Sequence, residues 1–401
     1  MRTLSTLLGL PQHRFASIHV VGTNGKSSVT QMLAALLEAH GVSAGACVSP
    51  HTVRWSERVL VHGREIAPAA FADAVERTAI AAEAVNRTLQ EGEAVTQFEL
   101  ATAAAFVALA AAGVEVAAIE AGLGGRLDAT NTIPSKVTVL TSVGLDHTEW
   151  LGESEEAIAA EKLAVLRDQT TLVLGRVSRS VVALAERVAS ERGARLVVAP
   201  DDPGPEIELR APGQFQRRNF ALACAAAAAF LGDLDRERVA GVAAGIEIPG
   251  RLERVGNDPP TLLDAAHNPD GARALSEALP EMAGDRPVIA VLAILADKDA
   301  GAMISALAPT LTRAVCTSFP AADGPESEQI GRFAAHRQAF GAAELAGVCA
   351  EVGLAAEPEA DFELAVARAR QLALDAGGVL LVTGSHYALA PARAALGLGV
   401  Q

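Results

Sequence analysis

The sequence has few cysteines and few aromatic residues, and these shortages exclude several classes of protein. Its four cysteines lie far apart among 401 residues, and no C-x-x-C pair occurs. Zinc ribbons, dithiol redox motifs and a disulfide framework are therefore unsupported, and the chain suits a reducing cytoplasm. No apolar run suits a membrane span, and the N-terminus lacks the basic-then-apolar pattern of a signal peptide.

Positive charge is also scarce. The chain has 33 lysines and arginines against 48 acidic residues, a formal net charge of −15. Such a chain is a poor candidate for binding nucleic acid or an anionic membrane through bulk charge, so we expect small-molecule partners. Lysine occurs at only four positions, Lys26, Lys136, Lys162 and Lys298, which makes each retained lysine worth examining.

Short apolar runs alternate with longer helical patterns along the whole chain. This alternation predicts an α/β fold with mostly parallel sheets flanked by helices. The proline- and glycine-rich stretch 248–260 is the best candidate linker, which predicts domains over 1–249 and 250–401. Residues 200–218 interrupt the alternation and are expected to form irregular strands and loops, whereas 326–340 is expected to be helical.

The sharpest motif is VVGTNGKSS, at 20–28, between a predicted strand and an amphipathic helix. Its glycines let the backbone fold around an anion, helix-terminal N–H groups face a phosphate, and Lys26 can reach the β- and γ-phosphates. The usual G-x-x-x-x-G-K-[ST] pattern would place a glycine at position 20, where this chain has Val20. An ordinary strand–turn–helix connection is the alternative, but the context favours phosphate binding.

Polar side chains follow several other predicted strands. Glu120 ends one strand ahead of a glycine-rich turn, His147 follows another, and Ser49 follows a third. Ligands of open α/β sheets bind at the carboxyl ends of the strands, and oxygen ligands suit Mg²⁺. Surface charge for Glu120, a structural histidine and a plain loop at Ser49 are the alternatives.

Two further groups are candidates. Lys162 lies on or beside the apolar stripe of a helix predicted over 154–167, where it either serves a site or extends to solvent. In the second domain, a strand ends at Asp264 and is followed by His267 and Asn268, which form a site or a surface loop.

Taken together, these residues resemble the folylpolyglutamate synthase/dihydrofolate synthase family of the Mur ligase superfamily. The matching motifs run in family order over nearly the whole chain: HVVGTNGKSS, SPHTVRWSERV, TQFELAT, IEAGLGGRLDATN, TSVGLDHTEWLG, AAEKLAVLR, GQFQRRNFALA, IPGRLERV, LLDAAHNPDGA, DKD at 297–299 and VTGSHYAL. GLGGRLDATN with LDHTEWLG separates this family from other Mur-type ligases. The family's phosphate loop also lacks the first glycine.

The resemblance implies a Mur-ligase-type P-loop ATPase domain followed by a smaller Rossmann-like domain. It also implies ATP-dependent addition of L-glutamate to dihydropteroate or to a folate through an acyl phosphate, with Mg²⁺. The residues implied to contact ATP are Asn24, Gly25, Lys26, Ser27, Ser28, Asn219, Arg251 and Asp264. Those implied to hold metal are Ser49, Glu120, His147 and Lys162, the last as a carbamate.

The resemblance further assigns catalytic and substrate-binding roles, and it implies a monomer whose domains close before chemistry. The catalytic group comprises Lys26, Lys162, His147 and His267, and the substrate-binding group Phe98, Arg126 and Asn268. Two departures stand out. The loop reads GKSS in place of the common GKGS or GKGT, and family members usually carry a further helical segment before LLGLPQHRF, part of which contributes to the pteroate site in bifunctional members.

Three rival functions remain at this point. A Mur-type ligase for a cell-wall precursor would share the phosphate loop and the modified lysine. A nucleotide switch or transport ATPase is disfavoured by the lack of an N-K-x-D motif, and a catalytically dead folate-binding protein by the presence of every expected chemical residue.

Overall fold

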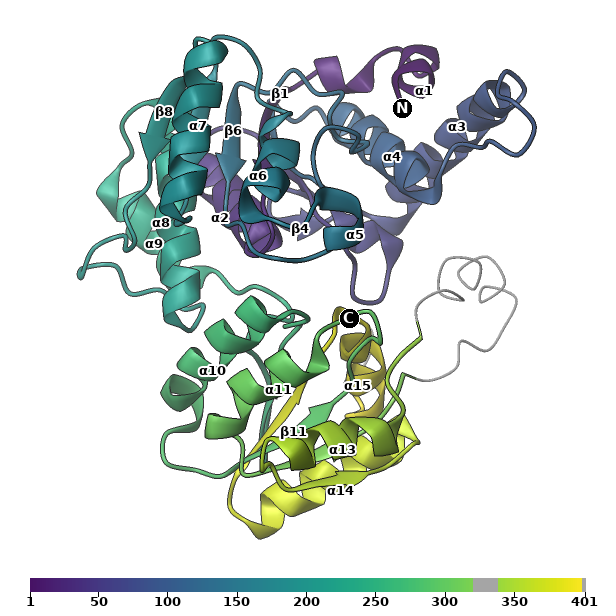
Figure 1. Ribbon diagram of the computed structural model, residues 1–401. Helices are drawn as coiled ribbons and strands as arrows, with labels where there is room; N and C mark the ends of the chain where they lie inside the picture. Colours follow the sequence, from purple (N-terminus) through teal and green to yellow (C-terminus); the bar gives the residue numbers. More distant parts are fainter. Residues whose placement is uncertain (320–337, 399–401) are drawn as a thin grey trace. The chain divides into compact units, whose positions relative to one another are not determined.

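The computed structural model describes residues 1–319 and 338–398, which form two compact units. The first unit comprises 1–210 and 216–246, and the second 211–215 and 247–401. Each unit is built on its own sheet and is described here by itself (Figure 1). The predicted domain boundary at 249/250 stays a prediction.

The first unit contains an eight-stranded sheet in the order β4-β3-β2-β5-β1-β6-β7-β8. In this sheet order, the six strands β2, β5, β1, β6, β7 and β8 are parallel to one another, and β3 and β4 add an antiparallel edge. Their bounds are β1 (Ala16–Val21), β2 (Ala44–Cys47), β3 (Val59–Val61), β4 (Arg64–Glu65), β5 (Val116–Glu120), β6 (Val137–Leu140), β7 (Thr171–Leu174) and β8 (Arg195–Val198).

Helices cover this sheet and connect its parallel strands. They are α1 (Arg2–Leu7), α2 (Lys26–Ala39), α3 (Pro68–Asn86), α4 (Gln97–Ala111), α5 (Thr148–Leu151), α6 (Glu155–Leu163), α7 (Arg179–Glu191), α8 (Gln214–Leu231) and α9 (Arg236–Gly245). Helix α2 packs on β1, β2 and β5. The central strands are almost wholly buried, as expected for a parallel sheet with both faces covered.

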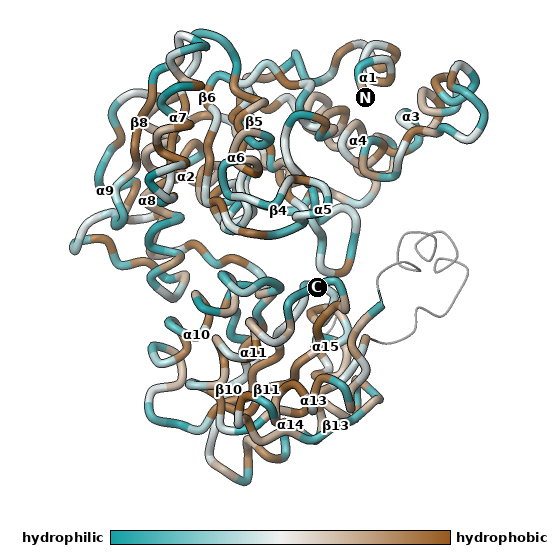
Figure 2. Tube along the Cα trace, in the orientation of Figure 1, coloured by the Kyte–Doolittle hydropathy of each residue, from teal (hydrophilic) through white to brown (hydrophobic). Residues whose placement is uncertain are grey.

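The second unit contains a six-stranded sheet in the order β13-β12-β11-β14-β10-β9, parallel except for β9. Its strands are β9 (Glu253–Asn257), β10 (Pro260–Leu263), β11 (Val288–Leu292), β12 (Arg313–Cys316), β13 (Ala356–Pro358) and β14 (Val379–Thr383). Its helices are α10 (Pro269–Ala283), α11 (Ala300–Leu307), α13 (Ala342–Glu351), α14 (Phe362–Asp375) and α15 (Leu389–Ala395). One apolar cluster packs under α10, α11 and α13, and another under α14 and α15. Figure 2 shows the apolar strands β10 and β11 inside these layers.

The α/β class with mostly parallel sheets is confirmed, but several local expectations were wrong. Residues 253–257 of the predicted linker form β9, the antiparallel edge of the second sheet. Residues 214–218, expected to be irregular, begin helix α8. Most of the helix predicted over 326–340 lies outside the described residues, and the sequence patterns missed α13.

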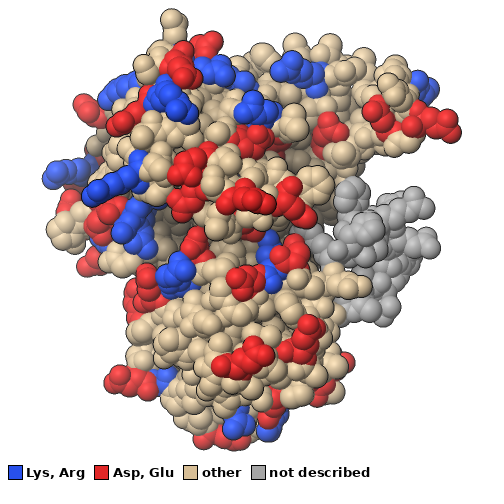
Figure 3. Space-filling model, viewed as in Figure 1, with Lys and Arg blue, Asp and Glu red and all other residues tan. Residues whose placement is uncertain are grey.

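All four cysteines are free thiols. Acidic and basic side chains are interspersed over the face seen in Figure 3. Within 1–319 and 338–398, no helix has the length and apolar character needed to cross a membrane.

Candidate functional site

The phosphate loop connects β1 to α2 at the carboxyl edge of the first sheet. Gly25 precedes α2 with φ of 84°, a left-handed conformation that glycine adopts at little cost. The loop is held against the end of β6, because the Asn24 carbonyl accepts hydrogen bonds from the hydroxyls of Thr141 (2.6 Å) and Ser142 (3.1 Å). The first N–H groups of α2 are therefore presented at a shaped turn, an arrangement suited to an anion.

Oxygen atoms from three segments meet beside this loop. The Ser27 hydroxyl lies within hydrogen-bond distance of two acceptors, the Glu120 carboxylate at 3.0 Å and the Ser49 carbonyl at 3.2 Å, and can donate its one proton to either. The Ser49 N–H donates to the other Glu120 oxygen at 2.8 Å. Hydroxyl, carboxylate and carbonyl oxygens are the donors that Mg²⁺ prefers, so this set fits a hard divalent cation.

Lys162 is buried, with 4% of its surface exposed. Its Nζ donates to the Gly22 carbonyl in the phosphate loop at 2.9 Å. Burial and, next, the charge of Lys26 lower the pKa of the Lys162 amine to about 7. The lysine thus belongs to the site and does not extend to solvent, and a large fraction of it is neutral at neutral pH.

Helix α6 is placed by the glycine-rich turn that follows β5. A Cβ on Gly125 would lie 2.7 Å from the Glu161 carbonyl oxygen and 2.8 Å from that of Lys162. The turn and the last residues of α6 therefore touch backbone to backbone, which only a glycine allows.

We expect Gly125→Ala to displace the end of α6 and with it Lys162. Because the atoms in the way are backbone oxygens, the clash should lower the free energy of unfolding by about 1–3 kcal/mol. Chemical denaturation measures this loss. The matched control is Gly241→Ala in α9, where a Cβ meets nothing within 4 Å. A Gly125→Ala protein as stable as this control would contradict the close contact.

Three further predicted residues lie at the glycine-rich turn or at the phosphate loop. The Phe98 ring lies against the backbone of Gly122, since a Cβ there would sit 2.3 Å from Phe98 Cζ. Arg126 is 62% exposed, and its Nε donates to the Glu161 carboxylate at 3.0 Å. The Asn219 amide oxygen would lie 2.6 Å from a Cβ on Gly25, so α8 delivers Asn219 to the phosphate loop.

His147 lies at the start of α5, with a left-handed φ of 50°. Its backbone N–H donates to Asp146 at 3.0 Å, and the Asp146 charge acts on Lys162. The same connection touches the phosphate loop, where the Gly144 N–H donates to the Thr23 hydroxyl at 3.1 Å. The segment carrying His147 is thus brought to the edge that holds Lys26 and Lys162.

The candidates of the second unit gather around Asp264 at the end of β10. Its carboxylate accepts from the N–H groups of Leu252 and Ala266, both at 2.8 Å, while burial raises its pKa. The charges of Arg251 and His267 oppose this rise. Asn268 is 3% exposed, and its side chain caps α10 by accepting from the Gly271 N–H at 2.8 Å.

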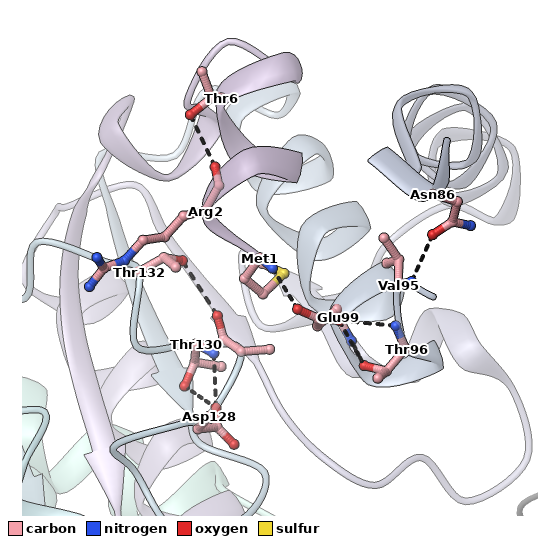
Figure 4. Close-up of polar contacts among 11 residues, drawn as sticks. Met1, Arg2, Thr6, Asn86, Val95, Thr96, Glu99, Asp128, Thr130 and Thr132 are labelled. Carbon is pink, nitrogen blue, oxygen red and sulfur yellow. Dashed lines mark hydrogen bonds and ion pairs between the residues drawn. The ribbon is translucent and has the colours of Figure 1, made fainter. Parts of the chain in front are cut away.

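Sequence reasoning missed the residue that organises the glycine-rich turn. The Asp128 carboxylate accepts from the N–H groups of Gly122 (3.0 Å) and Leu123 (2.9 Å). It also accepts from the Thr130 N–H at 2.9 Å (Figure 4). Burial raises its pKa, and these hydrogen bonds oppose the rise. The available signal was its place as the single acid within GLGGRLDATN.

The first unit therefore combines an anion-binding loop, an oxygen set that suits a divalent cation, and a buried amine of lowered pKa. The described residues contain no cluster of three or more histidine, cysteine, aspartate or glutamate side chains that could hold a metal ion by themselves. A cation at this edge would instead use the hydroxyl, carbonyl and carboxylate oxygens together with phosphate oxygens. Such an edge can bind a metal–nucleoside triphosphate and stabilise charge during phosphoryl transfer.

Comparisons with known proteins agree with this chemistry. Residues 20–187 match the Mur ligase middle domain, and residues 250–386 match the Mur ligase glutamate ligase domain. The chain is 35% identical to the dihydrofolate synthase/folylpolyglutamate synthase of Mycobacterium tuberculosis, over 78% of this chain and 72% of that protein.

Solved structures are similar as well. A Mycobacterium tuberculosis folylpolyglutamate synthase complexed with ADP superposes with a TM-score of 0.89 at 31% identity, covering 100% of this chain and 94% of that one. A bifunctional folylpolyglutamate synthase/dihydrofolate synthase from Yersinia pestis, complexed with AMPPNP and Mn ion, gives 0.82 at 29% identity, covering 98% and 92%.

Proposed function

Because the chain belongs to the folylpolyglutamate synthase/dihydrofolate synthase family of Mur ligases, we propose roles for its residues in glutamate ligation. The protein is an ATP- and divalent-metal-dependent ligase that adds L-glutamate to dihydropteroate or to the glutamate tail of a folate. The contact of the buried Lys162 amine with the phosphate loop carries the residue assignment.

ATP binds at the turn between β1 and α2 in this proposal. The backbone of Asn24 and Gly25 and the side chains of Lys26, Ser27 and Ser28 surround the triphosphate, with Asn219 beside Gly25. Lys26 offsets the charge that accumulates on the phosphoryl oxygens during transfer.

Ser27, Ser49 and Glu120 are the residues that would hold Mg²⁺, and His147 would join them through the adjoining connection. A magnesium ion bound there supplies positive charge for the phosphate oxygens. Mg²⁺ commonly uses one or two carboxylates together with substrate phosphates, which the pairing of Ser27 with Glu120 supports.

Lys162 acts as a carbamate. The lone pair of its neutral amine attacks the carbon of carbon dioxide, a C–N bond forms while one C=O π bond breaks and leaves its electron pair on oxygen, and the nitrogen loses one proton to solvent, which gives an anionic carbamate on Nζ. The lowered pKa supports this step, because only the unprotonated amine is a nucleophile. The resulting anion serves the second metal position, where an ammonium would be repelled.

The reaction then proceeds in two displacements. A substrate carboxylate oxygen attacks the γ-phosphorus and the bond to the β-phosphate oxygen breaks, giving an acyl phosphate and ADP. The glutamate amine attacks the acyl carbon, phosphate leaves, and the nitrogen loses a proton. Holding the reacting groups in place provides much of the acceleration.

The pterin-bearing substrate meets the turn after β5. Phe98 offers a ring beside Gly122, and Arg126 offers a cation for a carboxylate. Apolar side chains near this turn are unusually exposed, with Leu127 at 91% and Trp150 at 72%. Such exposure supports a surface that a flat ligand covers.

For the second unit, we propose that Arg251 and Asp264 interact with ATP and that His267 and Asn268 act on the reacting groups. Residues 1–249 would form the ATP-binding domain and 250–401 the glutamate ligase domain. The protein acts as a monomer in the cytoplasm, which its four free thiols support.

The decisive assay is phosphate release with ATP, Mg²⁺ and L-glutamate, run separately with dihydropteroate and with tetrahydrofolate. We expect release that requires glutamate. Release with dihydropteroate demonstrates dihydrofolate synthase activity, and release with tetrahydrofolate demonstrates polyglutamate ligation. No phosphate release with either substrate, together with turnover of a cell-wall precursor, would overturn the assignment in favour of a Mur-type ligase.

A further inference from the structure

A chain of side-chain hydrogen bonds runs from β1, the strand that precedes the phosphate loop, to the glycine-rich turn. His19 in β1 is fully buried, and its Nε2 lies 2.8 Å from the Thr130 hydroxyl. The Thr130 hydroxyl in turn donates to Asp128 Oδ1 at 2.5 Å (Figure 4). Strand β1 and the glycine-rich turn, 111 residues apart in sequence, are thereby joined.

The protons of this chain can be assigned by counting donors. A threonine hydroxyl has one proton, and Thr130 gives it to a carboxylate that otherwise accepts only from N–H groups. The contact between Thr130 and His19 therefore requires an N–H on Nε2 of the histidine. His19 is then the neutral Nε2–H tautomer, and its Nδ1, which has no hydrogen-bond partner among the described residues, carries the lone pair.

The surroundings keep His19 neutral. Burial, followed by the charge of Arg167, lowers the pKa of His19 to about 3. Arg167 donates to the carbonyls of Asn131 and Ile133, so it secures the same connection as Thr130 does. The cross-strand neighbours of His19, Thr138 and Ile119, carry no charge.

A hydrophobic residue would be the ordinary choice at position 19. The same face of the sheet carries Ile119 on one side and Leu172 beyond Thr138 on the other, each within an apolar cluster. Burying an imidazole there costs free energy unless its N–H is bonded. The bond to Thr130 supplies that compensation and fixes where the hydroxyl points.

Asp128 transmits this constraint to the substrate side. Its second oxygen accepts from the N–H groups of Gly122 and Leu123, which follow the end of β5, and Phe98 lies on the backbone of Gly122. Without the His19 bond, the Thr130 hydroxyl loses one of the two contacts that fix its orientation, and its hydrogen bond to Asp128 is less constrained.

We propose that His19 is a positioning residue that acts through Thr130 and Asp128 to hold the glycine-rich turn in its substrate-binding form. We expect His19 to affect binding of the pterin-bearing substrate. This expectation rests on the proposed function, which assigns Phe98 to that substrate. Glu120, on the proposed metal side of the site, is held by its hydrogen bonds to Ser27 and Ser49. ATP affinity should therefore depend much less on the hydrogen-bond chain through His19.

Paired variants test the proposal in the full-length protein. Thr130→Val removes the hydroxyl at nearly constant shape, whereas Thr130→Ser keeps it. His19→Leu removes the donor, whereas His19→Gln keeps an N–H near the place of Nε2. We expect Thr130→Val and His19→Leu to raise KM for the pterin-bearing substrate about tenfold, with KM for ATP changed less than twofold, and the two conservative variants to restore most of the loss.

Thr138→Val is the matched control, because this buried hydroxyl neighbours His19 across the strands and has no hydrogen-bond partner among the described residues. It should leave both KM values unchanged. Equal KM values in all five variants, or equal losses for both substrates, would overturn the proposal.

A spectroscopic measurement is independent of the reaction. In ¹⁵N-histidine spectra, the signal that disappears in His19→Gln should report the Nε2–H tautomer and should not titrate between pH 8 and 5. A protonated Nδ1 or a titrating signal would overturn the inference. A wild-type protein without glutamate-dependent phosphate release would overturn the proposed function while leaving this tautomer testable.

Discussion

Lys162→Ala is expected to abolish turnover, with kcat reduced on the order of a thousandfold or more. The side chain is 4% exposed, and its Nζ bonds the phosphate loop, so alanine removes a group from the centre of the site. As an anionic carbamate it would hold metal, and alanine cannot form one. Added bicarbonate should therefore not rescue the variant.

The measurement is ATP- and glutamate-dependent phosphate release, together with ¹³C NMR of protein equilibrated with ¹³C-bicarbonate. The wild type should show a carbamate signal that Lys162→Ala lacks. Because the lysine pKa is lowered to about 7, the amine becomes protonated as the pH falls through 7, and the carbamate signal should decline there. Lys136→Ala, at an exposed lysine, is the control. Near-normal turnover in Lys162→Ala would refute the carbamate role.

Glu120→Gln is expected to lower kcat about 10²–10³-fold and to raise the Mg²⁺ concentration needed for half-maximal activity at least about tenfold. The amide keeps an oxygen that can accept from the Ser49 N–H or the Ser27 hydroxyl, but it loses the negative charge. The loss should thus fall on metal binding while the strand stays in place.

Titration of activity with MgCl₂ at saturating ATP measures this shift, and thermal unfolding without metal checks the fold. Glu115→Gln is the matched control, because Glu115 is exposed just before the first residue of the same strand, and its carboxylate accepts from the Ser43 N–H there. An unchanged Mg²⁺ requirement in Glu120→Gln would show that this carboxylate holds no metal.

Local sequence patterns were sufficient for the architecture and for the edge where the site lies. Alternating apolar runs and amphipathic helices depend on neighbours a few residues away, so the strands around β1, β5 and β6 could be placed from their own residues. Since parallel strands end at one edge, the residues after them were expected together, and the structure brings Ser27, Glu120 and Ser49 together there. The resemblance to a ligase family was equally a property of the motifs.

Some elements could not be predicted, because their stability comes from long-range partners. Strand β9 has a half-exposed, irregular sequence, and it forms because β10 offers an antiparallel edge. Helix α8 begins earlier than its apolar pattern suggested. The reason is that the fold buries Gln216, a polar side chain that an isolated helix would expose to solvent.

The sequence by itself determined the fold class, the phosphate loop and the family, because each is written in contiguous residues. Only the tertiary structure decided the state of single side chains. Lys162 was equally compatible with solvent until its burial and its bond to Gly22 were known. His19, Thr130 and Asp128 form one chain although up to 111 residues separate them, and no local pattern records such a contact. Burial and long-range hydrogen bonds set the proton positions and pKa values, and these arise only when distant segments pack together.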